Sequence, residues 1–77
     1  MKALRLKEFR ETKNLSQREL AQRLGITQAY YWKWEIGKSF PNAKQILKLC
    51  DTLECSPNDL FGFKGVHAVV IERLEHD

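Results

Sequence analysis

The stretch SQRELAQRLGIT, residues 16–27, decides the fold, because it contains the start of one helix, its end and the cap of the next. Ser16 and Glu19 have the spacing of a capping box, in which each side chain accepts a backbone N–H at the start of a helix. Gly25 can adopt the left-handed conformation that closes a helix, and Thr27 is a favoured N-cap residue. The stretch therefore predicts two short helices that are joined by a tight turn.

Similar signals on both sides of this stretch predict three further helices. Asn14 tolerates the left-handed conformation and closes a first helix near Lys13, and Gly37 closes the helix of about residues 28–36. Capping residues then predict a fourth helix that ends at about Leu53 and a short fifth one; these caps are Asn42 with Gln45, and Ser56 before Pro57. The fold is therefore expected to be all-α, with five short helices.

Apolar residues recur at three- or four-residue spacing within these helices, which predicts one buried face on each. The predicted core consists of Leu6, Phe9, Leu20, Ala21, Leu24, Tyr31, Trp34, Ile46, Leu49, Cys50 and Leu53. The aromatic run AYYWKWE, residues 29–35, is divided between two faces: Tyr31 and Trp34 lie on the core stripe, whereas Tyr30 and Trp32 point elsewhere. An exposed Tyr and Trp beside a core face favour presentation to a partner.

The composition of the 77-residue chain, 43% hydrophobic and 30% charged, is that of one globular domain. No apolar run approaches the roughly 20 residues of a membrane span, and the N-terminus lacks the apolar segment of a signal peptide. We therefore expect a cytoplasmic protein without membrane contact. Cys50 and Cys55 are too few for a disulfide scaffold, and His67 and His76 lack the paired spacing of zinc ligands. We expect reduced core cysteines, no metal and no other cofactor.

Charge is distributed unevenly along the chain. Residues 1–48 hold 11 Lys and Arg against four Glu, which gives +7, whereas residues 49–77 hold two Lys and Arg against six Asp and Glu, which gives −4. A basic half beside an acidic half suggests a polyanionic partner on one side only. Catalysis is not expected, because no Ser/His/Asp or Cys/His set has a workable spacing.

Residues 6–62 resemble the Cro and lambda-repressor-like helix-turn-helix DNA-binding domains. The motifs that carry the resemblance are Arg10, SQRELAQRLGIT, WEIGK at residues 34–38, Pro41 and ILKLCDTLECSPNDLF at residues 46–61. The resemblance implies a compact five-helix DNA-binding domain over residues 1–62, with the helix-turn-helix at about residues 17–36 and a C-terminal extension over residues 63–77. It also implies a sequence-specific regulator of transcription, of the phage or mobile-element repressor type, which binds a palindromic operator in double-stranded DNA as a homodimer.

The resemblance further implies that the start of the third helix enters the major groove, so that Gln28, Ala29, Trp32 and Lys33 are candidate base-reading residues. The amide of Gln28 can bond adenine through N6 and N7, and Lys33 can donate to O6 and N7 of guanine. Ala29 could contact the methyl group of thymine. Trp32 could contact either such a methyl group or the edge of a sugar. Gln28 and Lys33 also fit the alternative of ordinary polar residues on a solvated helix.

Phosphate contacts are expected around this helix, where they position the protein and carry little sequence information. The candidates are Gln17, Arg18, Thr27, Tyr30, Lys38, Ser39 and Lys44. Gln17 is among them because free backbone amides and the positive end of a helix attract phosphate. The resemblance assigns a different role to Arg10 and Glu35, an ion pair between the first and third helices that fixes the recognition helix.

Two features lie outside the family pattern. The C-terminal extension contains the apolar run AVVI, residues 68–71, which fits a strand, although Val66, Val70 and Leu74 could also form a helical stripe. We expect dimerisation through Val69, Val70 and Ile71; the alternatives are packing against the chain's own domain and a chain cut from a longer protein.

Tyr30 and Trp32 are the second departure, since small or polar residues are more usual at those positions of the family. They leave a second function open, that of an antitoxin or protein-interaction module with the same fold. Such a module would use Tyr30 and Trp32 to contact a protein partner.

Overall fold

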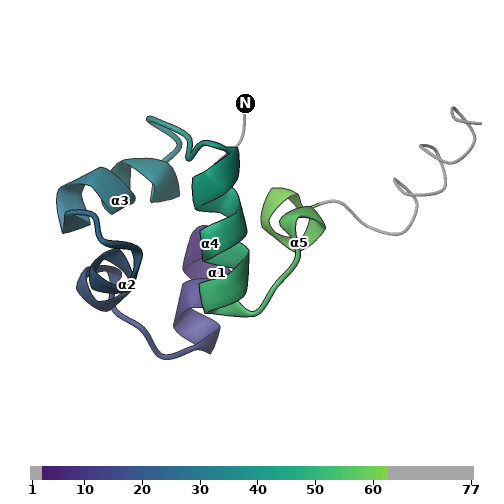
Figure 1. Cartoon of the computed structure of the whole chain (residues 1–77), viewed down its shortest axis with the longest axis horizontal. Coiled ribbons are helices and arrows are strands. Elements are labelled where there is room, and N and C mark those ends of the chain that lie inside the picture. The colour runs from purple at the N-terminus through teal and green to yellow at the C-terminus, as the bar shows by residue number, and fades with distance from the viewer. Residues whose placement is uncertain (1–2, 63–77) are drawn as a thin grey trace, which may run out of the picture.

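Among the residues that the structure describes, five α-helices follow one another (Figure 1): α1 (Leu6–Thr12), α2 (Gln17–Leu24), α3 (Gln28–Glu35), α4 (Ala43–Leu53) and α5 (Pro57–Phe61). The computed structural model describes residues 3–62, and no strand occurs among them. The all-α, five-helix prediction is confirmed. The C-terminal extension lies outside the described residues, so its assignment to a strand or helix and its role in dimerisation stay predictions.

Side-chain caps start the last four of these helices. At α2 the Oγ of Ser16 accepts the N–H of Glu19 at 3.0 Å, and the Glu19 carboxylate accepts the N–H of Ser16 at 2.9 Å. The same reciprocal box starts α4 and α5, and Thr27 accepts the N–H of Tyr30 at the start of α3. Each cap satisfies amides that have no partner within their helix, which is why these short helices begin where the sequence predicts.

Left-handed residues close several helices. Gly25 has φ +73° after α2 and Asn14 has φ +56° after α1, as their residue types predict. Glu54 after α4 was not predicted to be left-handed, yet it has φ +54°. The next amide, that of Cys55, donates to the carbonyl of Cys50 at 3.0 Å, and the Glu54 carboxylate meets Lys13 Nζ at 2.6 Å. These contacts stabilise a conformation that the residue type disfavours.

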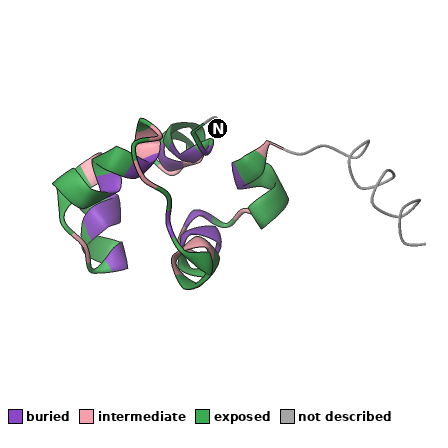
Figure 2. Ribbon diagram, turned by 90° about the horizontal axis from the view of Figure 1, so that it is seen from above, coloured by how far each residue is buried: buried purple, intermediate pink, exposed green. Residues whose placement is uncertain are grey.

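The core is built from the inner side of every helix; Figure 2 shows that the helices carry both buried and exposed positions. The predicted core residues are buried, except that Phe9 and Ile46 are only partly buried and pack against its edge. Residues outside the predicted stripes complete it, namely Leu4, Leu15 and Leu60. Leu4 lies before α1 and Leu15 lies between α1 and α2, so helical periodicity could not predict that they are buried.

The helices are arranged so that α1 and α4 lie between the α2–α3 pair and α5 (Figures 1 and 2). The contact between α2 and α3 is the most extensive of any pair of helices in the described part of the chain. The two helices of the predicted helix-turn-helix therefore form one packed unit on one side of the molecule, and α5 is on the other.

Two of the three leucines of α4 offer a matched test of this core. Leu49 is fully buried, whereas Leu47, two residues earlier, is 64% exposed. We expect Leu49→Ala to lower the free energy of unfolding by about 2–5 kcal/mol, because it removes buried methyl groups and leaves a cavity. Leu47→Ala should change it by less than about 0.5 kcal/mol. Urea unfolding followed by circular dichroism measures both, and equal losses would contradict the burial of α4 described above.

Candidate nucleic-acid interface

The candidate base-reading residues lie together on the outer side of α3. Gln28, Ala29, Trp32 and Lys33 are all exposed, and Trp32 is 42% exposed. Their spacing of one, three and four residues places them on one surface of a helix of two turns. Tyr31 and Trp34, between and after them, are buried in the core. One helix thus presents a polar and aromatic surface to solvent while its opposite side is held by packing.

Tyr30 is placed between these two sides of α3. Its side chain is 48% exposed, and its ring meets that of Trp34 edge-on with the ring centres 5.4 Å apart. Edge-to-face contacts of this kind stabilise the position of an aromatic ring. Tyr30 is therefore an exposed residue whose ring is braced against the core.

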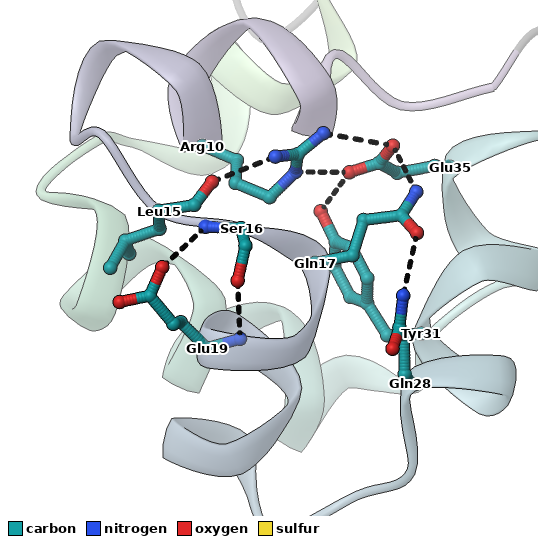
Figure 3. A network of polar contacts seen from close by, with 8 residues as sticks. All are labelled: Arg10, Leu15, Ser16, Gln17, Glu19, Gln28, Tyr31 and Glu35. Atoms are coloured by element: carbon teal, nitrogen blue, oxygen red, sulfur yellow. Dashed lines mark hydrogen bonds and ion pairs between the residues drawn. The ribbon is translucent and has the colours of Figure 1, made fainter.

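Below this surface, the carboxylate of Glu35 is the centre of a hydrogen-bond network (Figure 3). Arg10 Nε lies 2.6 Å from Glu35 Oε2, so the structure brings together the two residues of the pair that the resemblance implied. A second nitrogen of Arg10, Nη1, donates to the carbonyl oxygen of Leu15 at 2.7 Å. The Arg10 side chain thus joins α1, the α1–α2 turn and the end of α3.

Two more side chains donate to the same carboxylate. The hydroxyl of Tyr31 donates to Glu35 Oε2 at 2.6 Å, and the amide of Gln17 donates to Oε1 at 3.0 Å. The sequence placed Tyr31 in the core for its ring alone and did not identify its polar contact. The signal was available, because Tyr31 and Glu35 are four residues apart on one helix and so face each other.

The network stabilises Glu35 in its charged form. Burial would raise the pKa of the Glu35 carboxyl, but the hydrogen bonds from Arg10, Tyr31 and Gln17 outweigh it and hold this pKa below its ordinary value. The hydrogen bond to Glu35 in turn raises the pKa of Arg10. Burial and the bond to Glu35 raise the pKa of the Tyr31 hydroxyl, which therefore stays a proton donor. Every donor around the carboxylate keeps its proton at neutral pH.

Gln17 connects this network to the exposed surface of α3. Its side-chain oxygen accepts the amide N–H of Gln28 at 3.4 Å, while its own amide donates to Glu35 (Figure 3). The sequence assigned Gln17 to phosphate contact from its place at the start of α2. In the structure its side chain is half-buried and connects Glu35 to the first residue of α3, and phosphate contact at the start of α2 stays a prediction.

The remaining candidates for phosphate contact surround α3. Arg18 is on α2, Lys38 and Ser39 follow α3, and Lys44 is in the first turn of α4. The three cations are exposed and have no carboxylate partner within residues 3–62, whereas Ser39 is half-buried. The Thr27 hydroxyl accepts the N–H of Tyr30 as a helix cap. Exposed cations without partners can neutralise an anion without first breaking an ion pair.

The described residues offer little support for other kinds of site. Within residues 3–62 no cluster of His, Cys, Asp and Glu is placed to hold a metal ion. No helix in this part of the chain combines the length and the apolar character that crossing a membrane requires. Cys50 and Cys55 are free thiols; burial raises the pKa of both, to about 11 for Cys55.

Comparison by sequence places the helix-turn-helix family profile on residues 6–60. The SPbeta prophage-derived uncharacterized HTH-type transcriptional regulator YonR of Bacillus subtilis is 45% identical over 64 residues, which are 83% of this chain and 57% of that protein. The chain spans about half the length of the curated relatives that it matches.

Comparison by structure gives neighbours with the same arrangement of helices. The restriction-modification controller protein C.AhdI of Aeromonas hydrophila has a TM-score of 0.67 and 38% identity, over 74% of this chain and 83% of that one. The P22 c2 repressor, in a crystal structure with a synthetic operator, has a TM-score of 0.69 and 30% identity, over 79% and 89% of the two chains.

The lowered pKa of Glu35 predicts how stability depends on pH. A carboxyl whose pKa falls on folding stabilises the protein above its unfolded pKa, ordinarily 4.5, and this contribution is lost as the pH falls through the lower, folded value. We expect Glu35→Gln to cost about 1–3 kcal/mol at pH 7, since Arg10 loses its charged partner. The cost should shrink below about pH 4.5.

Urea unfolding of both proteins between about pH 3 and 7 measures this difference. The pKa values of Glu19, Glu54 and Asp59 are also lowered by their hydrogen bonds, but those groups are common to both proteins and cancel in the comparison. A cost that did not vary with pH would mean that the charge of Glu35 contributes nothing to folding.

Proposed function

The chain belongs to the helix-turn-helix family of the Cro and lambda-repressor type, and on that premise we propose that it is a sequence-specific double-stranded DNA-binding transcriptional regulator. The observation that carries the proposal is the outer side of α3. There Gln28, Ala29, Trp32 and Lys33 are exposed together, while Glu35 of the same helix is held by donors from three helices. Base recognition in the major groove requires a rigid helix whose exposed polar side chains are free to hydrogen-bond to base edges.

The proposed roles of these residues follow from their chemistry. Gln28 is suited to bond adenine bidentately, and Lys33, one turn further along, is suited to donate to guanine. The bond from Gln28 to Gln17 supports this role, because it orients the amide of Gln28 before DNA arrives. A side chain that is already oriented loses less conformational entropy on binding.

Phosphate contacts would come from the cations that surround α3. Arg18, Lys38 and Lys44 are exposed on three different segments, and residues 1–48 carry a net charge of +7. We also assign phosphate contact to the hydroxyl of Tyr30, whose side chain is 48% exposed, and to Thr27 and Ser39 at the two ends of α3. For Gln17 we propose contact through the backbone at the start of α2, because its side chain already serves the network.

A phage or mobile-element repressor is the regulator type that we favour. The similarity to a prophage-derived regulator and to the P22 c2 repressor supports this assignment. The site of action of such a protein is the cytoplasm, and no catalytic activity is proposed.

We further propose a homodimer that binds a palindromic operator. One recognition helix contacts only a few base pairs, and pairing doubles the contacts over half-sites about 34 Å apart. Val69, Val70 and Ile71 of the C-terminal extension are the proposed contact residues, on the strength of their apolar sequence. The extension follows α5, which lies on the other side of α1 and α4 from the α2–α3 unit (Figure 1). Dimerisation there would leave α3 accessible.

A second candidate function is that of an antitoxin or protein-interaction module. The specific observation in its favour is the exposure of two large aromatic side chains, Tyr30 and Trp32, on one short helix. A protein partner would bury both of them, and DNA would then not be required.

DNA binding and its dependence on salt test the leading proposal. Duplexes selected from a random-sequence pool should bind the full chain, and a fivefold rise in salt concentration should weaken binding by roughly two orders of magnitude or more, because bound cations are released from several phosphates. Gel shift across a salt series measures this. Failure to select any sequence, or an affinity indifferent to salt, would favour the second candidate.

Gln28→Ala provides the matched control for specificity. Gln28 is exposed, and within residues 3–62 its side chain hydrogen-bonds only to Gln17, so the variant should melt at nearly the wild-type temperature. Its affinity should fall by about 1–3 kcal/mol for the selected sequence and hardly at all for unrelated DNA.

The role of the extension is tested separately by deleting residues 66–77. We expect the full chain to sediment as a dimer and the deletion as a monomer, with the same helical circular dichroism spectrum. Specific affinity should fall steeply while weak non-specific binding persists, since only the second recognition helix is lost. A full-length monomer at tens of micromolar, or a deletion that still dimerises, would show that the apolar run has another role.

A further inference from the structure

Both cysteines of the chain lie at one place in the fold, the turn that joins α4 to α5. Cys50 is buried in the last turns of α4, and Cys55 is half-buried just after that helix. Cys55 packs against the cluster of buried residues that contains Cys50. Both are free thiols, so the structure shows the reduced form of two cysteines that share one edge of the core.

The backbone of this turn holds the two cysteines against each other. Glu54 between them is left-handed, with φ +54°, and the amide of Cys55 donates to the carbonyl oxygen of Cys50 at 3.0 Å. A hydrogen bond from the second residue beyond a helix to its last turn is the Schellman arrangement, in which the side chains of the two bonded residues commonly meet. The ion pair of Glu54 with Lys13, at 2.6 Å, ties this turn to the end of α1.

The two thiols also act on each other. Burial raises the pKa of both, and the Cys50 thiol raises the pKa of Cys55 further. In the other direction, a hydrogen bond from Cys55 offsets part of the rise in the pKa of Cys50. The carboxylate of Asp59, on α5, adds a smaller upward effect on both. Side chains that shift each other in this way face each other, so the pairing extends from the backbone to the sulfur atoms.

We propose that Cys50 and Cys55 are a redox-active pair, which a low-molecular-weight disulfide converts into one intramolecular disulfide across the turn between α4 and α5. A disulfide requires two α-carbons within about 7 Å and side chains directed at each other. The backbone bond holds the α-carbons near each other, and the contact of the thiols provides the direction. The proposal concerns the stability of the domain and does not depend on the proposed DNA-binding function.

The reaction consists of two thiol–disulfide exchanges, for which oxidised glutathione is a suitable reagent. Cys55, the more accessible thiol, loses its proton and attacks one sulfur of glutathione disulfide, whose S–S bond breaks; the departing thiolate takes up a proton. Cys50 then loses its proton and attacks the Cys55 sulfur, and the second glutathione leaves and is protonated in turn. The cysteine pair loses two electrons and two protons, and the reagent gains both.

The raised pKa values determine how fast the pair reacts. The thiolate is the attacking species, and it is scarce near neutral pH when the pKa of Cys55 is about 11. The exchange is therefore slow, and the pair responds to sustained oxidising conditions rather than to brief ones. Disulfides of this transient kind are the ones that occur in reducing compartments.

Folding and disulfide formation favour each other. The fold brings the sulfurs together, so the disulfide forms more readily in the folded chain than in the unfolded one. By the same factor, the disulfide favours the folded chain, because the two equilibria are linked. For the loop of residues 50–55 the constraint on the unfolded chain corresponds to between about tenfold and a hundredfold in the folding equilibrium constant.

Oxidation of the full chain in glutathione buffers tests the proposal. The protein would be equilibrated with a range of ratios of reduced to oxidised glutathione, its remaining thiols blocked with iodoacetamide, and the products weighed by mass spectrometry. We expect a monomer that has lost two hydrogens and carries no blocking group until it is reduced. The equilibrium constant for its formation should be between about tenfold and a hundredfold larger in buffer than in urea that unfolds the chain.

Thermal unfolding of the oxidised product gives the second readout. Its melting temperature should exceed that of the reduced chain by roughly 5–15 °C, and a reducing agent should reverse the change. Cys55→Ala is the matched control, because it keeps Cys50 but has no partner for it. Glutathione treatment should leave the melting temperature of this variant unchanged.

The other outcomes overturn the proposal. Disulfide-linked dimers as the main product would mean that the thiols react between chains. Glutathione adducts that never resolve would mean that the second sulfur cannot reach the first. An equilibrium constant that is the same in urea, or a melting temperature that falls on oxidation, would mean that the fold does not hold the pair in a geometry suited to a disulfide. Each of these results is measured on the wild-type chain, so none depends on the folding of a variant.

Discussion

The buried carboxylate of Glu35 is the interaction on which the arrangement of the helices depends. It accepts hydrogen bonds from Arg10 on α1, Gln17 on α2 and Tyr31 on α3, and it is itself the last residue of α3 (Figure 3). A buried ion pair contributes little net stability, because removing two charges from water offsets most of their attraction, but an unpaired partner is costly. The network therefore penalises any packing in which α3 is rotated or shifted relative to α1 and α2.

Apolar packing alone would not impose this constraint on so small a core. The buried residues are mostly leucines, and hydrophobic side chains of similar size tolerate small shifts of one helix over another. Hydrogen bonds of 2.6–3.0 Å do not tolerate such shifts, because their energy falls steeply as the distance and angle depart from the best values. The orientation set at Glu35 passes to the outer surface through Gln17 and Gln28, so one polar chain runs from the buried ion pair to the first residue of α3.

Most of the fold could be predicted from the sequence because its signals are local. Capping boxes, left-handed Asn and Gly residues and helical periodicity each involve residues within about four positions, and they placed the five helices. Burial of Leu4 and Leu60 and the left-handed Glu54 were missed, since each depends on contacts made by distant segments, such as the bond from the Arg5 amide to the Leu60 carbonyl. The Arg10–Glu35 pair joins residues 25 positions apart and came only from the family resemblance. The half-buried side chain of Gln17 was unforeseen for the same reason.

The aromatic run of α3 shows how two turns of helix can serve both the core and a partner. Tyr31 and Trp34 anchor the helix from inside, and the Tyr31 hydroxyl also holds Glu35, so no further apolar residue is needed there. Tyr30 and Trp32 can then remain partly exposed, at 48% and 42%. Because more than half of the Trp32 surface is already covered, its indole has less rotational freedom to lose on binding than a fully exposed ring would have. An aromatic side chain with few rotatable bonds, mounted on a helix fixed by a buried carboxylate, is therefore preorganised for contact with whatever surface approaches α3.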